Sequence, residues 1–223
     1  MICIAVSAPD NSVIDVLRTG GGINKSEGKE TIVIDAGHGG RDPGKVGVNN
    51  TLEKDINLNI ALKLKSLLEQ NDYNVIMTRS DDSGLYSESD SNKKVSDMRK
   101  RVEIINSSKA ALAISIHQNS FTAEEIKGAQ VFYYTVSDEG KEYANILQDQ
   151  LKKTLNDGNK RQAKGNDAYY MLKKTQIPIV IVECGYLSNN KEAQLLNTED
   201  YQEKMAWAIH LGIINYLNKQ KSD

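Results

Sequence analysis

Short apolar runs alternate with segments of helical periodicity along most of this chain. The runs have the length and β-branched content of buried strands, and the segments between them repeat apolar residues every three or four positions. The expected strands cover residues 31–36, 74–78, 111–117, 129–135 and 179–182, and the expected helices cover 53–70, 95–107, 139–155 and 200–217. Because this alternation builds strand–helix–strand units, we expect one α/β domain, a mostly parallel twisted sheet with helices on both faces.

Composition excludes several classes of protein. The 223 residues are enough for one domain with a sizeable core. With 28 basic and 30 acidic residues the net charge is −2, which disfavours binding of nucleic acid by phosphate neutralisation. No run of about 18 apolar residues is present, so no spanning helix is expected. The two cysteines, Cys3 and Cys184, are too few for a thiolate cluster.

The first thirty residues differ in character from the rest. Residues 1–8 are apolar and end in Val6-Ser7-Ala8, which is similar to an export cleavage site without the basic start of a full signal. We interpret them as the remnant of a leader, although an ordinary first strand fits them equally well. Residues 10–30 contain three successive glycines and are interpreted as a flexible linker. The expected organisation is a leader remnant and linker over 1–30, a folded domain over 31–218 and a tail over 219–223.

Four residues that can bind a metal or transfer a proton lie at strand ends or at the start of a helix. His38 follows the first strand, His117 ends the third and Glu183 ends the last, while Glu53 begins the first helix. In open α/β sheets, sites form beyond the carboxyl ends of the strands. Two histidines and one carboxylate with an open position are the usual ligands of a hydrolytic zinc site. A second carboxylate beside them would serve as general base.

Each of these residues also has a purely structural explanation. His38 can fill a Gly-rich turn, and Glu53 can be an acid that favours the first turn of a helix. His117 can be a hydrogen-bonded core residue. Glu183 is the hardest to explain structurally, because a carboxylate directly after four apolar β-branched residues risks burial without a partner. The third histidine, His210, lies within a helix and is interpreted as structural.

A nucleotide-binding motif competes for the same loop. Residues 39–45 have the G-x-x-x-x-G-K spacing of a P-loop and follow a strand. However, Val46 stands where a hydroxyl should bind magnesium, and Pro43 removes a backbone N–H that should contact phosphate. Asp42 likewise replaces the third glycine of a G-x-G-x-x-G pattern. Nucleotide binding is therefore a distant alternative.

Four motifs in this order resemble those of the zinc-dependent N-acetylmuramoyl-L-alanine amidases. They are residues 33–40 (VIDAGHGG), 52–55 (LEKD), 115–119 (SIHQN) and 182–189 (VECGYLSN). The resemblance runs from about residue 31 to residue 217. Together with residues 56–58 (INL) it is strongest to the sporulation amidases that act on spore cortex.

The resemblance implies an activity and a set of roles. It implies that His38, Glu53 and His117 bind one zinc ion, and that Glu183 is the catalytic base and acid. The implied substrate is peptidoglycan, cleaved at the amide between the muramic lactyl group and L-alanine, in the muramic lactam pathway of cortex maturation. A zinc ion lowers the pKa of its bound water towards about 7, which supplies hydroxide at neutral pH. An alternative is a catalytically weak peptidoglycan-binding homologue that needs a partner.

Three further residues have two interpretations each. Asn119 either hydrogen-bonds a ligand or the substrate, or ties the strand end to its loop. Arg101 either contacts anionic muropeptide carboxylates or lies on a solvated helix face, and we favour the solvated face. Cys184 points away from Glu183 on an alternating strand, so we expect it in the core and not as a nucleophile.

Many secreted wall amidases carry wall-binding modules or a long regulatory helix, and neither is evident here. We therefore expect an extracytoplasmic enzyme, in the cell wall or the space between spore membranes, that is held in place by something else. The candidates are a membrane anchor lost with the leader and a separate exported or membrane-anchored accessory protein, which would also help to complete the metal site.

Overall fold

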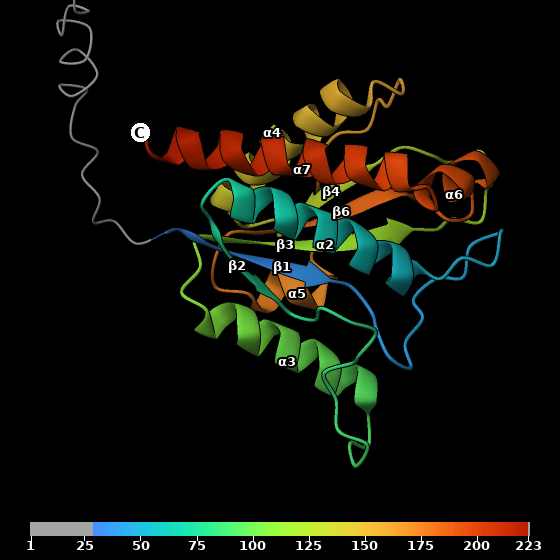
Figure 1. Ribbon diagram of the computed structural model, residues 1–223, viewed down its shortest axis with the longest axis horizontal. Helices are drawn as coiled ribbons and strands as arrows, with labels where there is room; N and C mark the ends of the chain where they lie inside the picture. The colour runs from blue at the N-terminus through green and yellow to red at the C-terminus, as the bar shows by residue number, and fades with distance from the viewer. Residues whose placement is uncertain (1–28, 223) are drawn as a thin grey trace, which may run out of the picture.

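The computed structural model describes residues 29–222, so the expected leader remnant and nearly all of the expected linker lie outside the described residues. Six strands form one sheet in the order β2-β1-β3-β6-β4-β5 (Figure 1). All neighbouring strands are parallel except β4 and β6, which are antiparallel. The predicted mostly parallel sheet of a single α/β domain is confirmed.

The strands and helices agree with the predicted alternation, with three additions. The strands are β1 (Thr31–Ala36), β2 (Asn74–Met77), β3 (Leu112–Asn119), β4 (Gln130–Tyr133), β5 (Lys164–Gly165) and β6 (Ile179–Tyr186). The helices are α2 (Glu53–Gln70), α3 (Lys93–Ser107), α4 (Asp138–Leu155), α5 (Tyr170–Lys174), α6 (Asn190–Leu196) and α7 (Glu199–Gln220). The additions are β5, α5 and α6, and β6 continues four residues beyond its predicted end at residue 182.

The two faces of the sheet are covered by different helices. Helices α2, α4 and α7 lie on one face, and α3 and α5 lie on the other (Figure 1). Side chains alternate between these faces along β1, since Ile32 and Ile34 join the larger apolar cluster with α2, α4 and α7. Val33 joins the smaller cluster, which includes residues of α3 and α5. The sequence of a central strand is a continuous apolar run because both faces of the strand are buried.

Close packing of α4 against α7 depends on one glycine. A Cβ placed on Gly212 of α7 would lie 2.3 Å from Cδ1 and 3.2 Å from Cα of Leu147 on α4, so a larger residue would force the Leu147 side chain to move and crowd the backbone of α4. Among the described residues no helix is both long enough and apolar enough to cross a membrane.

Three strands bring their carboxyl ends to one edge of the sheet. Ala36 at the end of β1 pairs with Ile116 of β3, and the next residue of β3, His117, pairs with Glu183 of β6. The register of β3 with β6 shifts between His117 and Asn119, where a bulge interrupts the ladder. Helix α2 begins at this same edge, because Glu53 contacts His117. The fold thus gathers all four predicted residues in one place.

Candidate metal centre and active site

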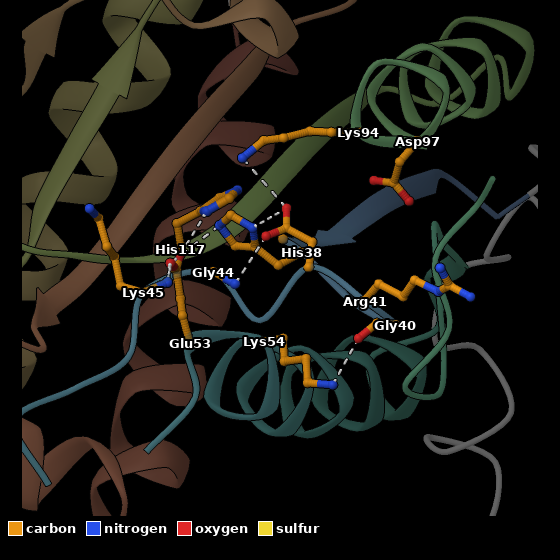
Figure 2. Close-up of polar contacts among 12 residues, drawn as sticks. His38, Gly40, Arg41, Gly44, Lys45, Glu53, Lys54, Lys94, Asp97 and His117 are labelled. Atoms are coloured by element: carbon orange, nitrogen blue, oxygen red, sulfur yellow. Dashed lines mark hydrogen bonds and ion pairs between the residues drawn. The ribbon is translucent and has the colours of Figure 1, made fainter. Parts of the chain in front are cut away.

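His38, Glu53 and His117 converge on one point beyond the sheet edge. His38 Nε2 lies 3.2 Å from Glu53 Oε2, and His117 Nδ1 lies 3.0 Å from Glu53 Oε1. Ligand atoms of the three residues all lie within 4.8 Å of one another. Figure 2 shows both imidazoles directed at the Glu53 carboxylate, which rises from the start of α2. Two nitrogen donors and one oxygen donor are a set that fits a zinc ion.

The Glu53 carboxylate is held as an anion by its surroundings. Its Oε2 accepts the backbone N–H of Lys45 at 2.8 Å, and its Oε1 accepts that of Gln118 at 3.1 Å. Burial opposes ionisation, yet hydrogen bonds with His117 and His38 hold the pKa of Glu53 far below its ordinary value. Burial would lower the pKa of His117, but the contact with Glu53 more than offsets this and raises it. The cluster therefore favours a charged carboxylate beside its two histidines.

The loop after β1 orients His38. Asp42 Oδ2 lies 2.9 Å from His38 Nδ1, which leaves Nε2 directed at the cluster. Lys94 reaches from α3 towards Asp42, at 3.7 Å from Oδ2 (Figure 2). A carboxylate that binds the far nitrogen of a histidine fixes its ring and raises its strength as a metal ligand. Gly44, in the same loop, packs closely against Glu53, because a Cβ at this position would lie 2.6 Å from Glu53 Oε2.

Glu183 lies beside the cluster, and one of its oxygens has no hydrogen-bond partner among residues 29–222. The residue is 6% exposed, and its Oε2 is buried without a hydrogen bond. Burial raises its pKa above the ordinary value, even though His117 acts in the opposite direction. Glu183 and the three clustered residues line one cavity of about 520 Å³. A carboxylate of raised pKa facing a cavity beside a metal-binding cluster is suited to accept and return a proton.

The family of the chain follows from comparison of its sequence with known proteins. The sequence profile of the N-acetylmuramoyl-L-alanine amidases matches residues 32–215. The chain belongs to this family. The cluster and Glu183 therefore lie in the catalytic domain of an amidohydrolase, and the resemblance inferred from the four motifs is confirmed.

Relatives and solved structures agree with this assignment. The amidase is 39% identical to the germination-specific N-acetylmuramoyl-L-alanine amidase of Bacillus subtilis, over 85% of this chain and 80% of that protein. It resembles the structure of the CwlD amidase from Clostridioides difficile in complex with the GerS lipoprotein (TM-score 0.83, 46% identity), which covers 85% of this chain and 99% of that one. The catalytic domain of CwlV from Bacillus (Paenibacillus) polymyxa var. colistinus gives a TM-score of 0.75 at 34% identity, over 85% and 98% of the two chains.

Arg101 of the amidase is neither solvated nor in the cavity, which corrects both sequence-based interpretations. The residue is 1% exposed, and its guanidinium forms ion pairs with Asp35 and Asp97. It also donates to the backbone carbonyl of His38 at 2.6 Å. The helical pattern around Arg101 could not reveal this burial, because the compensating Asp35 comes from a strand far away in the sequence.

The remaining sequence-based candidates lie as follows. Asn119 lines the cavity, and its Oδ1 accepts the backbone N–H of the next residue, as expected if it ties the strand to its loop. Its contact with substrate stays a prediction. Cys184 is fully buried in the larger apolar cluster, so its expected place in the core is confirmed. His210 is buried and stacks on Trp207, which agrees with a structural role.

Sequence reasoning missed several residues that shape the amidase site. Arg79 is 4% exposed and donates to the carbonyls of Ala36 and Gly37. Tyr169 donates to Glu183 Oε1 at 3.3 Å. In sequence Asp42 figures only in the nucleotide-binding pattern, whereas in the structure it contacts His38 Nδ1, the position of an orienting carboxylate.

Proposed function

We propose that this amidase is zinc-dependent and hydrolyses the lactyl–L-alanine amide of peptidoglycan, with His38, Glu53 and His117 as the zinc ligands and Glu183 as base and acid. One observation carries the proposal. The ligand atoms of the three residues gather within 4.8 Å of one another, beside a buried Glu183 oxygen that has no hydrogen-bond partner in the described part of the chain. The family to which the chain belongs supports the choice of bond.

The residues present suit a zinc ion. His38 Nε2, His117 Nδ1 and the Glu53 carboxylate supply three donors. Asp42 contacts the other ring nitrogen of His38, Nδ1, and so orients the ring. A zinc ion held there polarises a carbonyl oxygen and lowers the pKa of a water molecule towards neutrality. The backbone N–H groups of Lys45 and Gln118 donate to the Glu53 carboxylate and hold it in place.

Glu183 handles the proton in this proposal. Its free Oε2 accepts a proton from the attacking water, and the resulting acid returns that proton to the leaving alanine nitrogen. Protonation matters because an amide nitrogen is a poor leaving group until it carries a second hydrogen. The raised pKa of Glu183, caused chiefly by burial, favours the return step.

Two measurements on one pair of variants test these roles. Glu183→Gln should release no peptide from purified peptidoglycan while it binds zinc as tightly as the wild type. His117→Ala should lose both zinc and activity. Near-full activity of Glu183→Gln would refute its role as base, and full zinc binding by His117→Ala would refute the ligand assignment. Exposed Glu125→Gln is the matched control and should behave like the wild type.

We further propose an extracytoplasmic role in the maturation of spore cortex, assisted by an accessory lipoprotein or other exported partner. The support comes from a relative named as germination-specific and from a related amidase whose structure holds a lipoprotein. The partner would aid targeting or completion of the metal site. Zinc content and peptide release of the purified chain should rise when such a partner is added. Full zinc occupancy and activity of the chain alone would make the partner unnecessary.

A further inference from the structure

Resting on the proposed role of Glu183, we propose that Tyr169 is a positioning residue for this carboxylate. Its phenol hydroxyl binds one oxygen of Glu183 and thereby directs the other towards the reacting groups. The structure gives the two oxygens different surroundings. Oε1 accepts the Tyr169 hydroxyl at 3.3 Å, whereas Oε2 is buried with no hydrogen-bond partner among the described residues.

The asymmetry matters for the chemistry of a base. A carboxylate free to rotate about its terminal bond presents either oxygen, and that bond has broad torsional minima. The hydrogen bond from Tyr169 to Oε1 restricts this rotation, so that the same oxygen, Oε2, stays without a hydrogen-bond partner among the described residues. Among the described residues the Tyr169 hydroxyl hydrogen-bonds to Glu183 and to none of the three residues of the metal-binding cluster, so it acts through the Glu183 carboxylate.

Tyr169 is itself held firmly by contacts on two sides. Its ring meets the edge of Phe132 with centroids 5.6 Å apart and planes at 85°. Its backbone N–H donates to Asn166 Oδ1 at 3.0 Å, and the same oxygen accepts the N–H of Ala168 at 2.7 Å. Aromatic edge contacts and an Asx turn together fix both the ring and the chain that carries it. The hydroxyl is therefore a preorganised donor.

The hydroxyl also stays protonated near neutral pH. Burial and the neighbouring charge of Glu183 raise the pKa of Tyr169 well above its ordinary value. Tyr169 thus donates a hydrogen bond throughout the reaction and gives up no proton. This behaviour separates it from Glu183, which must change its protonation state.

Tyr169→Phe tests the proposal because it removes only the hydroxyl. We expect kcat to fall roughly 3- to 10-fold, the effect of one moderate hydrogen bond, because the Tyr169 hydroxyl and Glu183 Oε1 lie 3.3 Å apart; KM should change less than about twofold. Zinc content and the midpoint of thermal unfolding should match the wild type. Tyr134→Phe is the matched control, since Tyr134 packs against the same apolar cluster and is not among the residues that line the cavity; its kinetics should be unchanged.

A double variant separates positioning from a general structural effect. In a Glu183→Asp background the shorter side chain no longer reaches the hydroxyl, so adding Tyr169→Phe should change kcat less than about twofold. A fall of the same size in both backgrounds, or an unchanged kcat in Tyr169→Phe alone, would overturn the proposal. These outcomes differ from failure of the proposed function, which Glu183→Gln reports on its own by keeping activity.

Discussion

The Arg101 guanidinium lies 2.7 Å from the Asp35 carboxylate, and both side chains are almost completely buried. The same guanidinium donates to the carbonyl of His38, whose φ of +62° is unusual for a residue other than glycine. The ion pair on the α3 face of the sheet therefore supports the backbone that carries one proposed zinc ligand. Through this contact the core holds His38 in a backbone conformation that it would rarely adopt alone.

Replacing Arg101 with methionine should destabilise the fold strongly. The variant leaves Asp35 as a buried carboxylate without its cation, a change that typically costs about 3–5 kcal/mol of unfolding free energy. Urea unfolding of the two proteins at neutral pH measures the loss. Arg99→Met is the control, because Arg99 is exposed on the same helix and its replacement should change stability by less than about 0.5 kcal/mol. Equal stability of Arg101→Met and Arg99→Met would contradict the importance of the pair.

Asp35 should make stability depend on pH in strongly acid solution. Burial opposes its ionisation, but Arg101, Ser115, Thr78 and the more distant His117 lower its pKa to about 2. Because the unfolded chain has the ordinary pKa of 3.8, Asp35 stabilises the fold above pH 4 by about 2 kcal/mol, and this is lost as the pH falls from 4 to 2. The carboxyl ¹³C resonance of Asp35 should titrate near pH 2. A midpoint near pH 4 would show that the ion pair does not hold the charge.

Much of the fold could be predicted from the sequence because its long elements are strongly periodic. Helix α2 begins and ends at the predicted residues, since the helical spacing of its apolar residues and the polar loops on either side define both of its ends. The missed α5 and α6 have five and seven residues, too few to show a helical repeat. The antiparallel direction of β4 was also not predictable, because an apolar run has no information about which way a strand points.

The proximity of the four candidate site residues could be predicted from the sequence, because the carboxyl ends of parallel strands meet at one edge of the sheet. Their convergence follows from the expectation of a mostly parallel sheet and from the positions of His38, His117 and Glu183 at or just after strand ends. The residues around them were missed because their environment comes from distant segments. Arg101 looks like any basic residue of an amphipathic helix until Asp35 is placed beside it, and Tyr169 precedes a helix that the sequence did not reveal.

Asp42 should strengthen metal binding by holding His38. Asp42→Asn keeps an oxygen for the backbone N–H of Gly44 but loses the charged acceptor for His38 Nδ1. Loss of such an orienting carboxylate typically costs about 10- to 100-fold in metal affinity. Competition with a chromophoric chelator measures the zinc affinity of each protein. Asp81→Asn, an exposed change in a nearby loop, should leave it unaltered. Zinc affinity within twofold of the wild type would show that His38 needs no such support.

A methyl group on Gly37 should displace His117 without breaking the fold. The Cβ of Gly37→Ala would lie 2.3 Å from His117 Cε1 and 2.4 Å from Nε2, so the imidazole must move away from its present position. We expect zinc affinity and peptide release to fall at least about tenfold, as for other losses of ligand orientation.

Gly158→Ala is the matched control: nothing lies within 4 Å of its new Cβ, but its φ of +75° makes alanine strained. That variant should lose about 1–2 kcal/mol of stability and keep its zinc affinity. If both variants bound zinc as the wild type does, close packing of Gly37 against His117 would have no part in metal binding.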